Sequence, residues 1–386
     1  MSSTSDSIEP AHSLSHSRSS QSAGTHRERI PVTIFDDAAS LSLTVANEIV
    51  SLISINRAAG KQTVLGLPTG STPIGVYQNL IRLYNSGDVD FSDVITFNLD
   101  EYFPMDPDSL QSYHRFMSEN FFSQVNIAPG NIHIPPGNIA ESDVDDFCAG
   151  YEQAIEDAGG IDLILLGIGR SGHIGFNEPG SGPNTITRII TLDAITRKDA
   201  GSDFFGEENV PREAITMGVG TILGARRIIL IATGEHKAPI IKRAVEGKQT
   251  LEVSATFLQK HEHAAFYIDD AASGELTRIK TPWLVREVEW TRALSHRAII
   301  WLSSQVDKSI MRLDAGDFHL HGLHTLTYAR PNIDELCREV FETLRKKIAY
   351  REDMMTGHKV IVFSPHPDDD VISMGGMLDT LATNEN

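Results

Sequence analysis

Short apolar runs alternate with segments of helical periodicity over most of the chain. Apolar residues recur at helical spacing between Val45 and Ile53, and the short apolar run Thr63–Leu67 follows and ends at Pro68. The alternation continues through four further short apolar runs, at 94–97, 161–166, 228–232 and 264–268. This pattern predicts an α/β fold in which helices cover both faces of a Rossmann-like, mostly parallel sheet. Because ligands of such folds bind beyond the carboxyl ends of the strands, the residues just after each strand are candidates for a site.

The main folded part is expected to span residues 30–312 as one domain, which a helical segment at 283–310 closes. A connector follows at 313–358. We expect it to be irregular over 314–331, where glycine, proline and histidine occur together, and helical from about 332 to 350.

The two ends of the chain differ in composition from its centre. Residues 1–29 are rich in serine and poor in large apolar side chains, so we expect a disordered tail without the apolar centre of a signal peptide. At the other end, the apolar run Lys359–Phe363 predicts a buried strand. Residues 359–386 are therefore expected to be the start of a second domain.

Charge and composition narrow the classes of function. The 386 residues are 40% hydrophobic, which is enough for a sizeable core, and 33 Lys and Arg against 52 Asp and Glu give a formal charge of −19. Such a charge argues against nucleic acid or an anionic membrane as a partner, but one lysine and local amides can still bind a small phosphorylated substrate. No apolar run approaches the roughly 18 residues that span a bilayer, and the two distant cysteines fit a reducing compartment. The sequence predicts a soluble, cytoplasmic protein and leaves a homo-oligomer open.

A turn rich in hydroxyl groups follows the first strong strand. It contains Thr69, Gly70, Ser71 and Thr72, whose backbone amides and hydroxyls could donate to a phosphate. An ordinary strand-to-helix turn with a Ser or Thr cap fits the same residues. Lys237, which follows a later strand and precedes a helical stretch, is a candidate to reach the same phosphate.

Two adjacent carboxylates, Asp100 and Glu101, follow the second strong strand. A carboxylate there could remove a proton from a carbon next to a carbonyl group. The alternative is a capping Asp beside a solvated Glu, and a lone Asp-Glu pair favours that alternative.

A loop with several glycines follows the third strand and contains His173 and Glu178. An imidazole in such a loop could shuttle protons near neutral pH while a carboxylate orients it. The glycine spacing at Gly167, Gly169 and Gly172 matches a dinucleotide fingerprint, but the loop follows a late strand and no helix pattern begins after it. A dinucleotide site is therefore disfavoured.

Five segments together resemble the glucosamine-6-phosphate deaminase family of sugar-phosphate isomerases. In family order they are Leu65–Pro73, Phe97–Tyr102, Gly172–Pro179, Thr216–Thr221 and Ala244–Gly247. The resemblance covers about residues 30–280. It implies that glucosamine 6-phosphate is opened, isomerised and deaminated to fructose 6-phosphate and ammonia, in amino-sugar catabolism and without a metal or organic cofactor.

The resemblance also implies roles for individual residues. Asp100 would move the proton from C2 to C1, His173 supported by Glu178 would open the ring, and the turn Thr69–Thr72 with Lys237 would bind the phosphate.

This chain departs from the family pattern at two places. Ser171 stands where family members commonly have Asp, and a hydroxyl cannot supply the negative charge that favours an imidazolium. Asp203 stands in a run that often includes an Arg for the phosphate, so Arg197 or another cation would have to substitute. Arg188 lies where family members contribute to an effector site, and a structural ion pair explains an arginine there equally well.

Near the end, the run Phe363–Asp370 resembles the opening motif of zinc-dependent sugar N-deacetylases. That resemblance implies that His366 and Asp369 bind zinc and that Asp368 acts as base. A catalytic zinc needs three protein ligands, and the third would lie beyond Asn386, so we expect no deacetylase activity from this chain.

Two other functions remain open for the main domain. It could be a related sugar-phosphate isomerase or lactonase of the same fold. It could also be a non-catalytic domain that binds an amino-sugar phosphate and regulates a deacetylase.

Overall fold

The structure is a computed structural model that describes residues 27–348, 357–363, 375, 377–379 and 381–382. It divides the chain into two compact units, Met1–Val285 and Arg286–Asn386. The division comes earlier than the expected boundary near residue 312. The physical reason is that the helix expected to close the first domain, α10 (Arg292–Val306), packs against α13 (Ile333–Ile348) in the second unit.

A parallel sheet forms the centre of the first unit. Its strand order is β1-β10-β9-β6-β2-β3-β5, and every neighbouring pair is parallel. The strands are β1 (Val32–Phe35), β2 (Thr63–Leu67), β3 (Val94–Asn98), β5 (Ile132–His133), β6 (Leu163–Leu166), β9 (Ile228–Ala232) and β10 (Ala264–Asp269). The predicted α/β fold is therefore confirmed, and each of the five apolar runs contains a strand.

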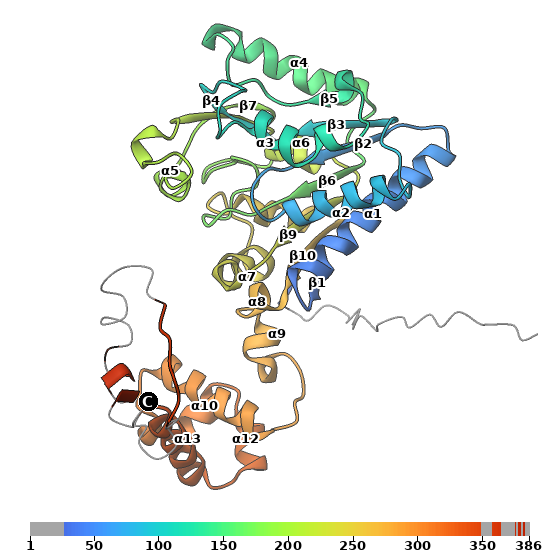
Figure 1. Cartoon of the computed structure of the whole chain (residues 1–386). Helices are drawn as coiled ribbons and strands as arrows, with labels where there is room; N and C mark the ends of the chain where they lie inside the picture. Colours follow the sequence, from blue (N-terminus) through green and yellow to red (C-terminus); the bar gives the residue numbers. More distant parts are fainter. Residues whose placement is uncertain (1–26, 349–356, 364–374, 376, 380, 383–386) are drawn as a thin grey trace, which may run out of the picture. The chain divides into compact units, whose positions relative to one another are not determined.

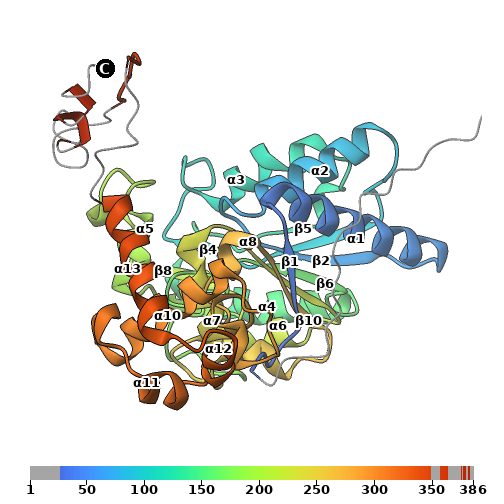
Figure 2. The ribbon, with the colours of Figure 1, turned by 90° about the horizontal axis from the view of Figure 1, so that it is seen from below.

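Helices cover both faces of this sheet (Figures 1 and 2). One face packs against α1 (Ala38–Ala58), α2 (Ile74–Asn85) and α3 (Tyr113–Asn120). The other face packs against α4 (Val144–Asp157), α6 (Val219–Leu223) and α7 (Ala238–Glu246). Neighbouring strand residues alternate between the two faces, so that Leu65 belongs to the first cluster and Val64 to the second.

A second, antiparallel sheet was not predicted. It has the strand order β4-β8-β7, formed by β4 (Asp100–Phe103), β7 (Arg188–Thr191) and β8 (Glu213–Thr216). The chain passes from the end of β3 into β4 through Leu99 alone, so the small sheet begins where the central strand ends. The short helices α5 (Ala194–Ala200), α8 (Asp270–Ser273) and α9 (Thr277–Lys280) complete the first unit.

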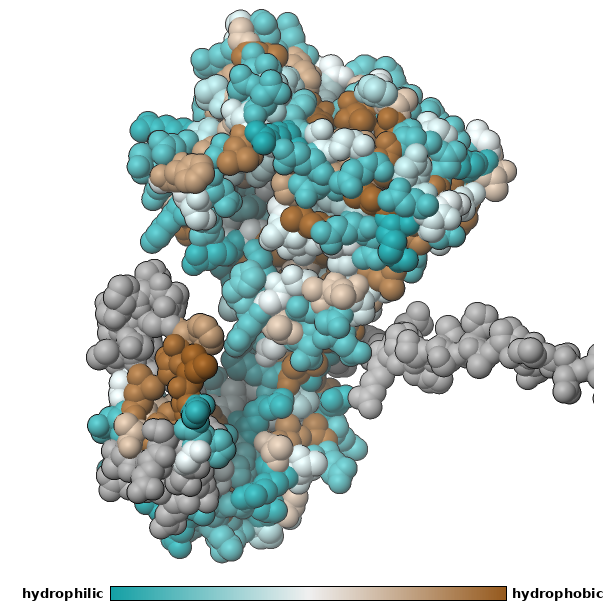
Figure 3. Space-filling view, in the orientation of Figure 1, coloured by the Kyte–Doolittle hydropathy of each residue, from teal (hydrophilic) through white to brown (hydrophobic). Residues whose placement is uncertain are grey.

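The helix α1 passes the length and composition test for a bilayer-spanning helix. This contradicts the expectation that no apolar run approaches that length. Leu41, Val45, Ile49 and Ile53 are buried in the core cluster that α1 shares with the sheet and α2, which is the packing of a core helix. On the face shown in Figure 3, hydrophilic side chains predominate over the first unit and apolar ones form small groups.

The second unit is helical over most of its described residues. It contains α10, α11 (Ala315–Leu320), α12 (His324–Ala329) and α13. The expected helix at about 332–350 is confirmed by α13, but the prediction of an irregular stretch at 314–331 was wrong. Asp314 caps α11 by accepting hydrogen bonds from the amides of Gly316 and Asp317, and this local cap allows a helix among residues that otherwise indicate a turn.

The predicted strand at Lys359–Phe363 is also wrong. Residues 357–363 contain no strand, and the side chains of Ile361 and Phe363 are 78% and 91% exposed. No described strand pairs with this backbone, and a strand without a partner leaves its polar groups unpaired. The motif residues His366, Asp368 and Asp369 lie outside the described residues, as do residues 1–26 of the expected tail.

Candidate active site

The candidate residues follow four strands that are neighbours in the sheet. The turn Thr69–Thr72 follows β2, Asp100 follows β3, the loop of His173 follows β6, and Lys237 follows β9. Because these strands are parallel and adjacent in the order β9-β6-β2-β3, their carboxyl ends meet at one edge of the sheet. This is the edge at which α/β folds bind ligands.

Asp100 opens β4 and is paired with Thr216 of β8. Its side chain is only 6% exposed. Burial, and secondly the charge of Glu101, raise the pKa of Asp100 to about 8. Burial also raises the pKa of Tyr113, and the charges of Tyr102 and Asp100 contribute to that rise. A carboxyl group of this kind can hold or release a proton near neutral pH.

Glu101 has a different role from its neighbour. It is buried and accepts hydrogen bonds from the start of α3, at 2.8 Å from the Tyr113 amide, 3.2 Å from the His114 amide and 2.8 Å from the Ser112 hydroxyl. Burial raises the pKa of Glu101 although these bonds oppose the rise. The alternative of a capping Asp and a solvated Glu is therefore wrong, because Glu101 caps the helix and Asp100 is buried.

His173 is surrounded by oxygen atoms on one side of its ring. Its Nδ1 lies 2.8 Å from Ser171 Oγ, 3.3 Å from Glu178 Oε2 and 3.4 Å from Thr196 Oγ1. Burial alone would raise the pKa of Glu178, but the hydrogen bond and charge of His173, with hydrogen bonds from Thr196 and the Asp193 amide, lower it. Glu178 is therefore an ionised partner for the imidazole.

Gly175 brings the His173 loop against Asp100. It has φ +54°, and a Cβ atom placed there would lie 3.3 Å from Asp100 Oδ2 and 3.0 Å from Thr216 Oγ1. The Thr216 hydroxyl accepts a hydrogen bond from the Phe176 amide, which holds the loop on β8. The structure thus brings together the predicted residues Asp100, His173 and Glu178. Gly175 itself was missed, although its place between His173 and Glu178 was visible in the sequence.

The turn Thr69–Thr72 leads from β2 to α2 without a side-chain cap. Gly70 has φ +99°, and the helix α2 that follows has Pro73 at its N-cap without a side-chain hydrogen bond. The alternative of a Ser or Thr cap is therefore wrong. Ser71 and Thr72 line a cavity of about 410 Å³ together with the start of α1 and Thr233, which follows β9.

Lys237 lies beside the loop that follows β6. Its Nζ donates a hydrogen bond of 2.8 Å to the carbonyl of Ile168. Burial lowers the pKa of Lys237, the charge of Asp199 opposes this, and the charge of Arg170 adds to it. Arg170 and Asp199 form an ion pair at 2.7 Å. Together with Lys237 they form a group of three charged side chains near the start of the His173 loop.

The structure also shows the contacts of Asp203, one of the two departures from the family pattern, and of Arg188. The Asp203 carbonyl accepts a hydrogen bond of 2.9 Å from Gln111, and the Asp203 charge adds to a rise in the pKa of Tyr102 that burial dominates. Arg188 donates to Asn177 Oδ1 at 3.1 Å and to Ser181 Oγ at 2.8 Å. Arg188 therefore holds the end of the His173 loop through hydrogen bonds to neutral side chains.

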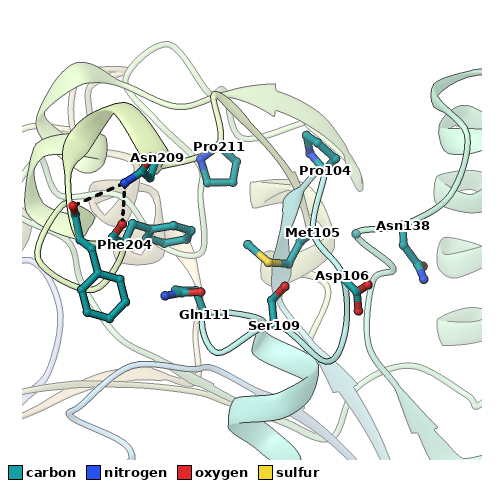
Figure 4. A pocket seen from close by; sticks show the side chains of 11 residues that line it. Pro104, Met105, Asp106, Ser109, Gln111, Asn138, Phe204, Asn209 and Pro211 are labelled. Atoms are coloured by element: carbon teal, nitrogen blue, oxygen red, sulfur yellow. Dashed lines mark hydrogen bonds between the residues drawn. The ribbon is translucent and has the colours of Figure 1, made fainter.

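A second cavity, of about 550 Å³, lies beside this site (Figure 4). Met105 and Phe204 face it from opposite sides, and Asn209 donates to the Phe204 carbonyl at its edge. Neither Asp100 nor His173 lines this cavity. These two residues do not line the cavity that contains Ser71 and Thr72 either, although that cavity adjoins the predicted phosphate turn.

Among the residues that the structure describes, no three His, Cys, Asp or Glu side chains are grouped closely enough to hold a metal ion. The proposed zinc ligands His366 and Asp369 lie outside those residues.

Comparison with known sequences identifies similar proteins. A family model described as glucosamine-6-phosphate isomerases/6-phosphogluconolactonase matches residues 36–267. A glucosamine-6-phosphate deaminase-like protein of Bacteroides thetaiotaomicron is 41% identical over 368 residues, which are 92% of this chain but 56% of that protein. The chain therefore spans little more than half the length of this relative. A glucosamine-6-phosphate deaminase of Thermoanaerobacter sp. is 52% identical over 211 residues, which are 55% of this chain and 83% of that protein.

Solved structures are similar over the first unit. A structure described as a monomeric glucosamine-6-phosphate deaminase of the NagB superfamily has a TM-score of 0.61 and 36% identity, and the match covers 64% of this chain and 100% of that chain. A 6-phosphogluconolactonase from Trypanosoma brucei has a TM-score of 0.53 and 18% identity, over 64% of this chain and 99% of that chain. At that identity the similarity shows the fold alone.

Proposed function

The chain belongs to the family of glucosamine-6-phosphate isomerases and 6-phosphogluconolactonases, and from this membership we propose that it is a glucosamine-6-phosphate deaminase. The reaction converts glucosamine 6-phosphate and water to fructose 6-phosphate and ammonia. One observation carries the proposal. The close approach of Gly175 to Asp100 supports a single site in which a buried carboxyl group and the His173 imidazole act on one sugar.

In the proposed reaction, His173 opens the sugar ring. The imidazole takes the proton of the C1 hydroxyl and returns a proton to the ring oxygen, so that the bond between C1 and this oxygen breaks and an aldehyde forms. Glu178 Oε2, 3.3 Å from Nδ1, stabilises the imidazolium between the two transfers. A general acid and base of this kind typically contributes about 10²- to 10⁴-fold to the rate.

Asp100 then moves a proton along the open chain. Its carboxylate removes the proton from C2 and delivers it to C1, while one proton of the amino group passes to the C1 oxygen. The C1 aldehyde becomes a CH2OH group and an imine is left at C2, which water hydrolyses to the ketone and ammonia. In the free protein the pKa of Asp100 is about 8. The ammonium group of the substrate next to C2 would favour the ionised carboxylate, because an opposite charge nearby lowers a carboxyl pKa. These steps are proton transfers and a hydrolysis, so they use no cofactor.

The phosphate is proposed to bind at the turn Thr69–Thr72. Ser71 and Thr72 line a cavity large enough for a small ligand, and Gly70 lets the backbone approach it. Lys237 supplies a positive charge from the end of β9, which β6 separates from β2 in the sheet. Moving from the Ile168 carbonyl to the phosphate would exchange one hydrogen bond for a charged one.

The direct test incubates the purified chain with glucosamine 6-phosphate and measures ammonia and fructose 6-phosphate. We expect the two products in equal amounts. Absence of both products, with the protein folded, would overturn the proposal. Release by Asp100→Asn at the unmodified rate would show that the proposed base is wrong.

The other two functions make different predictions. A related isomerase or lactonase would act on another member of a panel of hexose 6-phosphates, galactosamine 6-phosphate and 6-phosphogluconolactone. A regulatory domain would bind glucosamine 6-phosphate tightly in calorimetry without turning it over.

The C-terminal motif and the cellular location are separate predictions. We propose that His366 and Asp369 are part of a deacetylase-like motif. Elemental analysis of zinc in the purified chain, compared with His366→Ala, tests the motif, and release of acetate from an N-acetylated amino sugar would contradict the expectation that this chain has no deacetylase activity. A cytoplasmic location would be checked by cell fractionation.

A further inference from the structure

The Nδ1 edge of His173 contacts two hydroxyl groups as well as one carboxylate. Ser171 Oγ lies at 2.8 Å, Thr196 Oγ1 at 3.4 Å and Glu178 Oε2 at 3.3 Å. The three oxygens come from two segments, since Ser171 and Glu178 are in the loop after β6 and Thr196 is in α5. Thr196 is buried and also donates to Glu178, so it links the imidazole to its carboxylate.

This arrangement favours one of the two ring nitrogens of His173 as the carrier of the proton. A carboxylate can only accept a hydrogen bond, and a hydroxyl can accept one as well, so the three oxygens favour a proton on Nδ1 of His173. In the neutral imidazole, Nε2 is then left without a proton and can accept one. Nε2 faces Gly169, where a Cβ atom would lie only 2.0 Å away, so glycine is needed there to accommodate the ring.

We propose that Ser171 and Thr196 are positioning residues for the ring-opening histidine. They hold the Nδ1 edge of His173 with uncharged hydroxyls, and Glu178 alone among the described contacts of the ring supplies a negative charge. This inference rests on the proposed deaminase function. Ser171 orients the imidazole of His173 but does not add the negative charge that a carboxylate at this position would add.

Other charged groups lie around the loop that contains His173. Asp100 lies across Gly175, and Lys237 with the Arg170–Asp199 pair lies at the base of the same loop. These groups are unchanged when Ser171 or Thr196 is substituted, so a shift in the His173 titration would report on the hydroxyl contacts.

The test uses Ser171→Ala, Thr196→Val and Ser171→Asp in the full chain, with Ser171→Thr as the conservative variant. For Ser171→Ala and Thr196→Val we expect kcat for ammonia release to fall about tenfold while KM changes less than about twofold, because the effect is on orientation. Ser171→Thr is expected to restore most of kcat. Ser171→Asp adds a carboxylate beside Nδ1, and the midpoint of the His173 titration is expected to move up by about one to three pH units. The acid limb of the rate profile moves with it, because the ring-opening base must be unprotonated.

A second readout does not depend on turnover. Nitrogen-15 NMR of the imidazole distinguishes the two neutral tautomers and follows the titration. The expected result is the Nδ1-H form in the unmodified protein and a weaker preference for it in Ser171→Ala and Thr196→Val. Ser202→Ala and Thr191→Val, which remove exposed hydroxyls from neighbouring segments, are matched controls that should change neither readout.

The outcomes separate the two proposals. An Nε2-H tautomer in the unmodified protein, or no change in tautomer and kcat in Ser171→Ala and Thr196→Val, would overturn the positioning role. An Nδ1-H tautomer that the variants weaken, in a protein that releases no ammonia, would support the positioning of His173 and overturn the deaminase function instead.

Discussion

Replacing Asp100 by Asn should remove activity and at the same time make the protein more stable at neutral pH. Asp100 is 6% exposed, and its pKa rises from 3.8 to about 8 on folding. Between these values the folded chain keeps a proton that the unfolded chain has lost, so the free energy of unfolding falls as pH rises. Asn cannot ionise, so in Asp100→Asn this fall in the free energy of unfolding with rising pH does not occur.

The magnitude follows from the two pKa values. One pKa unit corresponds to about 1.36 kcal/mol, so the stability gained by Asp100→Asn should grow from near zero at about pH 4 to at most about 4 kcal/mol at pH 7. Above about pH 8 the gain should level off at no more than about 6 kcal/mol. A buried amide can add a cost of its own, but that cost does not depend on pH.

The assay is urea unfolding of both proteins at several pH values between 5 and 9, together with ammonia release from glucosamine 6-phosphate. Activity should fall about 10²- to 10⁴-fold, the usual contribution of a general base. Asp145→Asn, which changes an exposed carboxylate on α4, is the matched control and should show no pH-dependent gain. A stability difference for Asp100→Asn that stays constant across this range would refute the reasoning, because Asp100 would then be ionised in the folded protein.

Three further substitutions test other parts of the structure. Gly175→Ala should lower kcat about tenfold or more and cost about 1–2 kcal/mol of stability, because alanine is strained at φ +54° and its Cβ would contact Asp100. Unchanged kinetics would show that this loop does not contribute to the site. Glu101→Gln should lower the pKa of Asp100 and move the acid limb of the kcat/KM profile to lower pH. It should also lower the free energy of unfolding by about 1–3 kcal/mol, because the side-chain amide of Gln would face the hydrogen-bond donors of α3. If the acid limb of the kcat/KM profile does not move, Asp100 is not the base. Asp307→Gly should raise the free energy of unfolding of the second unit by about 1 kcal/mol in urea titrations, because Asp307 ends α10 at φ +51°; a loss of stability would contradict this.

The strands of the central sheet could be predicted because both of their faces are buried. Leu65 and Val64 point to opposite clusters, so the whole run had to be apolar, and such a run is visible in the sequence. The small sheet could not be predicted in the same way. Its strands β7 and β8 have only four residues each, and β4 pairs with a segment more than a hundred positions later, as in the pair Asp100 and Thr216.

The candidate site residues that the sequence indicates are those that follow a strand, and a partner supplied by another part of the fold has no such signal. Asp100, His173 and Glu178 each follow a strand, which is a local signal. Thr196 reaches His173 from α5, and no motif marks it. The error at Lys359–Phe363 has a related cause, since an apolar run becomes a strand only when another strand pairs with it.

The contact of Glu101 with α3 links the packing of this helix to the pKa of the adjacent carboxyl group of Asp100. Glu101 is held at the start of α3 by the amides of Tyr113 and His114, and it is this fixed charge that adds to the effect of burial on Asp100. Any change that weakens the attachment of α3 would let Glu101 reach water and would lower the pKa of Asp100. The proton affinity of the proposed base and the docking of α3 should therefore vary together, so variants at Ser112, which donates to Glu101, are expected to move the pH profile as well as the stability.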